Sequence, residues 1–167
     1  MARKFEDLPA FTNAMSKRVD PVVTKLVKAA ATAAGRTAVE KTRADTGKAR
    51  SNWIAQLNFA NTQIRPPYAP GNKLGFGERG NAVAAMAQHR SVISQFNTTR
   101  HQSIFISNNL DYIGILNNGG PRVSPGAMAQ QAVQAAQVAI KSERVLKSIV
   151  PRGASGFRRV GQGSIQV

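Results

Sequence analysis

Apolar residues recur at helical spacing between residues 20 and 43. Asp20 followed by Pro21 is typical of a helix start, because Asp caps the first turn and Pro fits the first helical position. The pattern predicts an amphipathic helix over residues 20–43 and a separate short helix over residues 7–18 before it. The apolar positions of the longer helix are Val23, Leu26, Val27, Ala30, Ala31, Ala34 and Ala38.

The polar side of this helix is basic and has two interpretations. Its cationic residues lie largely away from the apolar positions: Lys25, Lys28, Arg36, Lys41 and Arg43. They form either a solvated face above an alanine-rich core contact or a surface that faces a neighbouring subunit or nucleic acid.

The period changes from helical to alternating in the stretch ADTGKARSNW, residues 44–53. Asp45 and Gly47 are turn residues, and Gly47 suits the left-handed backbone that ends many helices. Beyond this turn, alternate positions are apolar: Trp53, Ala55, Leu57 and Phe59. The alternation predicts a strand over residues 50–60 in which Trp53 is a core anchor.

Residues 65–80 are rich in proline and glycine, which predicts a loop between two elements. Within them, residues 75–80 match the GxGxxG pattern of dinucleotide-binding proteins. That site needs a strand directly before it and an acidic residue about 20 positions later. Here the preceding residues are proline-rich and the next acid after Glu78 is Asp111, so we do not predict a nucleotide site.

The second half of the chain predicts a helix over residues 81–96, a short strand over residues 102–107, and within residues 108–121 one or two helical turns closed by Gly119 and Gly120. The helix has its apolar residues at Val83, Met86, Ala87, Ile93 and Phe96. The strand is apolar on both faces, which indicates a place inside a sheet or against a neighbour.

Ser124 and Pro125 repeat the cap-and-proline signal and predict a last helix that runs to about residue 148. Its apolar face comprises Met128, Ala132, Ala135, Ala136, Ala139, Ile140 and Leu146. The first half of its polar face is glutamine-rich and almost uncharged. That composition fits burial against another protein, and an ordinary solvated face fits it equally well.

These elements together predict an α+β fold, in which a twisted antiparallel β-sheet is flanked by a long N-terminal helix and a C-terminal helix. We expect a single domain over residues 1–149 and a basic, Gly/Arg-rich extended arm over residues 150–167. The arm has no core-forming period, so we expect a neighbouring subunit to hold it, with residues 164–167 adding a strand to a partner's sheet edge.

The charge balance is strongly basic, with 23 Lys and Arg against 8 Asp and Glu, a net charge of +15. This excess is spread along the chain and implies a polyanion or an acidic neighbour. Aromatic residues make up only 6% of the chain, which weakens a function based on stacking bases.

The chain offers little material for catalysis or metal binding. It has no cysteine, which excludes disulfides, thiolate zinc sites and a cysteine nucleophile and fits a reducing cytoplasm. His89 and His101 are the only histidines, and we predict surface or capping roles for both. We therefore expect no enzymatic activity, no cofactor and no metal. No run approaches 18 apolar residues, so we also expect no membrane span.

Three segments together resemble the neck and tail-completion proteins of tailed bacteriophages: ADTGKARSNW at 44–53, SIFISNNLDYIGILNNGG at 103–120 and SPGAMAQQAVQAA at 124–136. In that family a long helix ends in an Asp-Thr-Gly turn, a strand leads to an Asn-Asn-x-x-Tyr segment, and a Gly-Gly turn precedes a last helix opened by Pro-Gly. The matching positions here are Asp45, Thr46, Gly47 and Arg50; Asn108, Asn109 and Tyr112; Gly119, Gly120, Pro125, Gly126 and Met128.

The resemblance implies a structural virion protein that forms a homo-oligomeric ring, a hexamer or a dodecamer, at the head-to-tail junction around the DNA channel. It implies structural turns at Asp45, Thr46, Gly47, Gly119 and Gly120. It also implies contacts with connector and tail proteins and nonspecific contact with packaged DNA. Arg50, Tyr112, Arg158 and Arg159 are the candidate partner contacts. The protein would be assembled in the host cytoplasm and located in the neck or tail of the virion.

Two features depart from the family pattern: Asn117 and Asn118 stand where an acidic residue often precedes the Gly-Gly turn, and the basic tail is an addition. Two alternatives remain. One alternative to a neck or tail-completion subunit is an adaptor or stopper ring protein of the same connector. The other is a sequence-nonspecific nucleic-acid-binding protein whose affinity weakens steeply with salt.

Overall fold

The computed structural model describes residues 8–43, 47–69 and 77–142. The chain begins with one continuous helix, α1, Leu8–Lys41. The predicted break at Asp20 and Pro21 is therefore wrong, since Pro21 lies inside α1. Instead of capping a new helix, the Asp20 carboxylate accepts a hydrogen bond from the Ser16 hydroxyl one turn earlier, at 2.8 Å.

A single helical turn, α2, Lys48–Ser51, follows Gly47. Gly47 has the left-handed conformation expected for the turn, with φ 77°, and it directly precedes α2. The predicted strand over residues 50–60 was therefore too long, because its first residues belong to α2. The Asp45 and Thr46 positions of the predicted turn lie outside the described residues.

The sheet has two antiparallel strands, β1, Ile54–Leu57, and β2, Ile104–Ser107. Their register pairs Ile54 with Ser107 and Leu57 with Ile104. Beyond Leu57, Asn58 has a positive φ of 68° and Phe59 is 62% exposed, so the apolar alternation ends before Phe59.

Helix α3, Glu78–Gln95, covers the edge of β1 that does not pair with β2. The side chain of Gln88 acts there like a neighbouring strand: its Oε1 accepts from the Ala55 N–H at 3.0 Å, and its Nε2 donates to the Ala55 carbonyl at 2.8 Å. A helix side chain thus forms hydrogen bonds with backbone groups of β1 that have no partner strand on this edge of the sheet.

The last elements are the short helix α4, Ile113–Asn118, and the helix α5, Met128–Lys141. The predicted start of α5 at Ser124 and Pro125 is wrong. Residues just before α5 are tied to the end of α4, since Gly126 N–H donates to the Leu116 carbonyl. The Asn117 Oδ1 accepts from the Ala129 N–H at 2.9 Å and so caps the first turn of α5 from a different helix.

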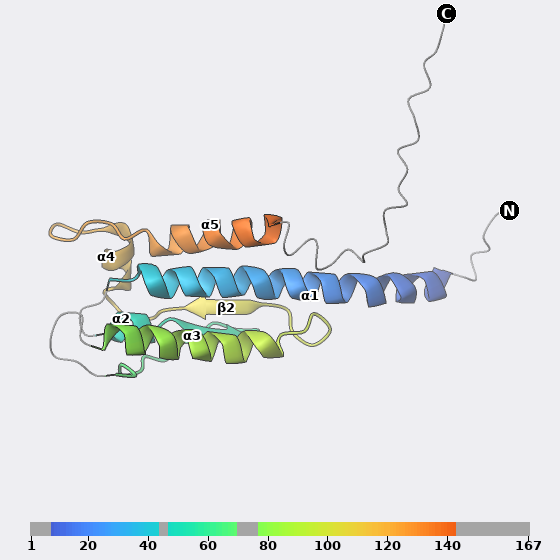
Figure 1. Cartoon of the computed structure of the whole chain (residues 1–167), viewed down its shortest axis with the longest axis horizontal. Helices are drawn as coiled ribbons and strands as arrows, with labels where there is room; N and C mark the ends of the chain where they lie inside the picture. The colour runs from blue at the N-terminus through green and yellow to red at the C-terminus, as the bar shows by residue number, and fades with distance from the viewer. Residues whose placement is uncertain (1–7, 44–46, 70–76, 143–167) are drawn as a thin grey trace, which may run out of the picture.

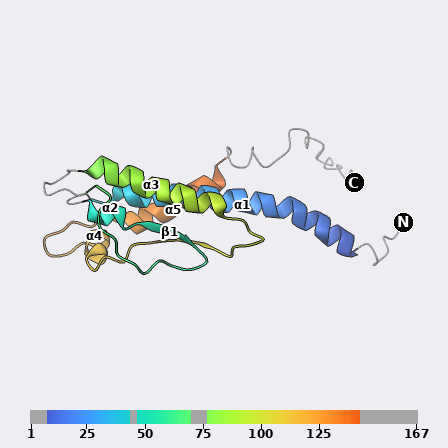
Figure 2. The same cartoon turned by 90° about the horizontal axis from the view of Figure 1, so that it is seen from below.

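Figures 1 and 2 show the arrangement of these elements: α5 lies along one side of α1, and the two strands and α3 lie on its other side. The N-terminal part of α1 extends beyond the ends of α3 and α5. The core between α1 and α3 contains Val39, Ala82 and Ala85, with Trp53 packed against it. The predicted α+β fold and the role of Trp53 as a core anchor are confirmed.

Candidate assembly surface

A buried asparagine, Asn81, organises the elbow around Gly47. Its Oδ1 accepts hydrogen bonds from the Ser51 hydroxyl at 2.7 Å and from the Ala69 N–H at 2.8 Å. Its Nδ2 donates to the carbonyls of Ala69 and Gly77, at 2.8 and 2.9 Å. Asn81 is fully buried, so these four bonds satisfy its whole polar group without water.

Asn52 holds the proline-rich loop in the same way. Its Oδ1 accepts from the Arg65 N–H, and its Nδ2 donates to the Arg65 and Lys48 carbonyls, each at 2.8 Å. Asn52 and Asn81 thus fix the start and the end of the described loop segment, residues 65–69. Of the predicted loop over residues 65–80, residues 70–76 lie outside the described residues and residues 78–80 belong to α3, so the predicted end was too late.

Gly47 lies against Asn81 so closely that only glycine fits. A Cβ at Gly47 would lie 2.0 Å from the Asn81 Nδ2, and the positive φ also favours glycine. Position 47 is therefore a packing site as well as a turn.

The predicted surface or capping role of His89 is wrong, because His89 is buried in α3. Its Nε2 lies 2.8 Å from the Trp53 carbonyl oxygen and therefore carries the proton that it donates. Its Nδ1 has no hydrogen-bond partner within the described part of the chain and packs against Gly35 of α1. Burial lowers the pKa of His89 below its ordinary value of 6.5, and the hydrogen bond to Trp53 opposes this only in part.

The buried residues of α3 are Asn81, Ala82, Ala85, His89 and Ile93, and Phe96, directly after the helix, is also buried. The predicted face included Val83 and Ala87, which are exposed. The spacing of three and four residues between Ala82, Ala85, His89 and Ile93 was a readable signal for a core histidine. We missed it because a polar residue interrupts the apolar pattern.

The candidate partner contact Arg50 bonds within its own chain. Its Nε donates to the Thr42 carbonyl at 2.8 Å, and its guanidinium also reaches the Glu40 carbonyl at 3.4 Å. A basic side chain at this position caps carbonyls at the C-terminal end of α1. The other two arginines of the set, Arg158 and Arg159, lie outside the described residues.

The Asn-Asn-x-x-Tyr segment connects β2 to α4. The Asn108 amide donates to the Ala49 carbonyl of α2 at 2.8 Å, and the Asn109 amide donates to the Asn61 carbonyl. Tyr112 stands at the start of α4 and is 39% exposed. The two asparagines thus have structural roles, whereas part of Tyr112 faces solvent.

The predicted Gly-Gly turn lies between α4 and α5. Gly119 has φ 87°, and a Cβ there would lie 2.9 Å from a ring carbon of Pro125. Gly120 pairs with Val123 in an isolated antiparallel bridge. Gly119 therefore allows the chain to reverse tightly before α5.

Residues 101–140, here called the neutral region, differ from the rest of the chain in charge. They contain β2, α4 and nearly all of α5, and their only acidic and basic residues are Asp111 and Arg122. The rest of the chain thus carries the whole net charge of +15. Large apolar side chains are nevertheless exposed in this region: Phe105, Tyr112, Ile115, Val133, Val138 and Ile140.

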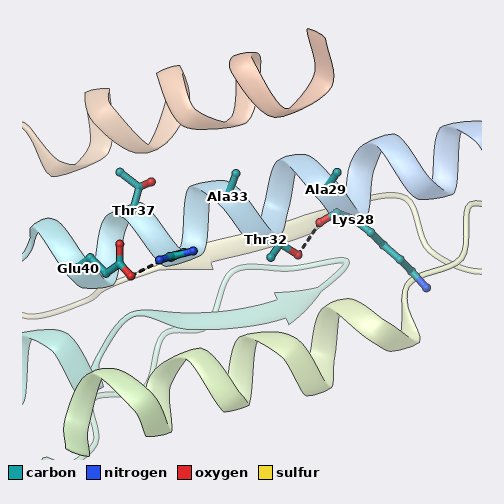
Figure 3. A pocket seen from close by; sticks show the side chains of 7 residues that line it. Lys28, Ala29, Thr32, Ala33, Thr37 and Glu40 are labelled. Carbon is teal, nitrogen blue, oxygen red and sulfur yellow. Dashed lines mark hydrogen bonds and ion pairs between the residues drawn. The ribbon is translucent and has the colours of Figure 1, made fainter. Parts of the chain in front are cut away.

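The exposed side of α1 is basic and shallowly grooved. A groove of about 570 Å³ is lined by α1 residues, among them Lys28, Arg36 and Glu40. Arg36 and Glu40 form an exposed ion pair at 2.8 Å. In Figure 3, Ala29, Ala33 and Thr37 point from successive turns of α1 towards α5, whereas Lys28 points away from α5. The small side chains mark the side of α1 that faces α5.

Within the described ranges, no three His, Cys, Asp or Glu side chains are grouped so that they could hold a metal ion. Among the helices of the same ranges, none combines the length and the apolar character needed to cross a membrane. Comparison of the chain with protein-family models, curated proteins and solved structures found no match.

Proposed function

We propose that this protein is a structural virion protein of a tailed phage, a neck or tail-completion subunit that forms a homo-oligomeric ring at the head-to-tail junction. The observation that carries the proposal is the separation of an uncharged surface with exposed apolar side chains from the basic rest of the chain. In a chain of net charge +15, the neutral region has no net charge and exposes six large apolar side chains, and six more are exposed elsewhere in the described residues.

This separation suits a subunit that meets two kinds of partner. Copies of a strongly cationic protein repel one another wherever their basic surfaces face, so they associate most easily through uncharged surface. The basic surface of α1 is then left for a phosphate backbone or for acidic neighbours, where contacts are independent of sequence. The order of the three motif segments, which resembles the phage neck family, supports the same function.

A second candidate is a sequence-nonspecific nucleic-acid-binding protein that acts as a monomer. It is favoured by the basic side chains of α1, which include Lys25, Lys28 and Lys41, and by Arg43 just after the helix. It gives no reason for the exposed apolar residues of α4 and α5, and we therefore place it second.

The native mass of the purified full chain, measured by sedimentation velocity and combined with negative-stain images, separates the two functions. The proposed function predicts a closed ring of several copies. A chain that stays monomeric at every concentration and binds short duplex DNA with a steep salt dependence would contradict the ring and support the second candidate.

A further inference from the structure

One side of α5 carries an apolar row in which Ala136 is half-buried and the other three residues are exposed: Ala129, Val133, Ala136 and Ile140. Their spacing of four, three and four residues places them along one line of the helix, as in the contact line of two packed helices. Val133 is 57% exposed and Ile140 is 42% exposed. We call these four residues the α5 row.

The contact between α5 and α1 is anchored by buried residues outside the α5 row. Met128 and Ala132, which are buried, lie on another side of the helix. The Met128 sulfur lies 3.1 Å from the Thr42 hydroxyl oxygen of α1. The fold thus anchors α5 through other residues and leaves Val133 and Ile140 at the surface.

The polar neighbours of the row are uncharged. Residues 123–140 contain no charged side chain, and the exposed polar residues of α5 before Lys141 are Gln130, Gln134 and Gln137. An acidic protein or a nucleic acid gains nothing from such a surface, because both are drawn to the basic parts of the chain. A second copy can approach here without bringing like charges together.

We propose that the α5 row packs against the neutral region of a second copy of this chain and is an interface of its homo-oligomer. This inference rests on the proposed function, because it assigns residues to the contact that a ring requires. It goes beyond that function by placing the contact on named residues of α5.

The substitution Val133→Glu tests the interface, and Gln134→Glu is its matched control. Both add one carboxylate to neighbouring exposed positions of α5, and only the first lies in the row. Burying an unpaired carboxylate in an apolar contact is strongly unfavourable, so Val133→Glu should weaken self-association by at least about tenfold. Gln134→Glu should assemble like the wild type. Because both positions are exposed, both variants should keep the wild-type thermal unfolding midpoint.

Thiol protection gives a second readout, because the chain has no cysteine of its own. In the assembled protein, Val133→Cys should react with a maleimide much more slowly than Gln134→Cys, and the two rates should become similar on dilution to monomers. Equal rates in the assembled state would overturn the interface.

The outcomes separate this inference from the proposed function. A wild-type ring that Val133→Glu leaves intact overturns the α5 interface and leaves the ring function standing. A wild-type chain that is monomeric at all concentrations overturns the ring function and the interface together. Selective loss of assembly in Val133→Glu supports both.

Discussion

The part of the molecule around α2 and α3 and the neutral region differ in where their most unusual side chains lie. Around α2 and α3, polar side chains are buried and paired, as Asn52 and Asn81 show. In the neutral region, apolar side chains such as Val133 and Val138 stand at the surface. A buried polar group must be paired to be tolerated, whereas a contiguous exposed apolar patch is typical of an interaction site.

This contrast separates folding from association. Substitutions in the buried polar network should lower the stability of each subunit. Substitutions on the α5 row should change the contacts between subunits and leave each subunit as stable as before. Three further changes, taken from the largest expected effect to the smallest, test how much the buried and paired polar side chains contribute to the stability of the subunit.

Asn81→Ala should have the largest effect. It removes both hydrogen bonds to Ala69, the acceptor of the Ser51 hydroxyl, and the side-chain bond to the Gly77 carbonyl, which keeps its bond from the backbone N–H of residue 81. We expect the free energy of unfolding to fall by about 3 to 5 kcal/mol, measured by urea denaturation. The exposed Asn118→Ala is the control and should change it by less than about 0.5 kcal/mol. Similar losses for the two variants would show that the network does not stabilise the fold.

Low pH should have a smaller effect through His89. Because burial lowers its pKa in the folded state, the unfolded chain binds a proton more readily below pH 6.5. Stability should therefore be fully present above 6.5 and decline as the pH falls through the lowered folded-state pKa. Thermal unfolding midpoints at several pH values measure this loss. His89→Gln should make the thermal unfolding midpoint less dependent on pH. If the pH dependence is unchanged in this variant, groups other than His89 cause it.

Arg50→Ala should have the smallest of the three effects. It removes the donor to the Thr42 and Glu40 carbonyls at the end of α1 and should cost about 1 kcal/mol in urea denaturation. Arg43→Ala removes the same charge from an exposed neighbouring position and is the control. If Arg50→Ala unfolds like Arg43→Ala but assembles poorly, Arg50 contacts a partner instead.

Local patterns predicted the elements of the fold better than their boundaries. The period-2 alternation identified β1, and the helical spacing identified α1 and α5. The helix starts at Pro21 and Pro125 were wrong for different reasons. Pro21 is accommodated within a long helix that packs along other elements. The start of α5 is set by Asn117, a residue of α4. Local helix propensity cannot predict such a contact between two helices.

The candidate site was predicted only in part. The uncharged glutamine-rich face of α5 was readable from the sequence, because it depends on composition alone. The exposure of Ile140 was not readable, since the same residue fits an apolar core face until the direction of packing is known. The burial of His89 was readable from helical spacing, whereas that of Asn81 was not, because pairing with residues distant in the sequence decides whether such a polar side chain is buried.

The central claim is that copies meet through uncharged apolar surface while their basic surfaces repel one another. The most direct test is the self-association constant of the wild-type chain, measured by sedimentation equilibrium as salt rises from about 0.05 M to about 0.5 M. Salt screens the repulsion and leaves apolar contacts in place, so association should strengthen as salt increases. Association that weakens as salt increases would show that ion pairs hold the copies together and would contradict the account.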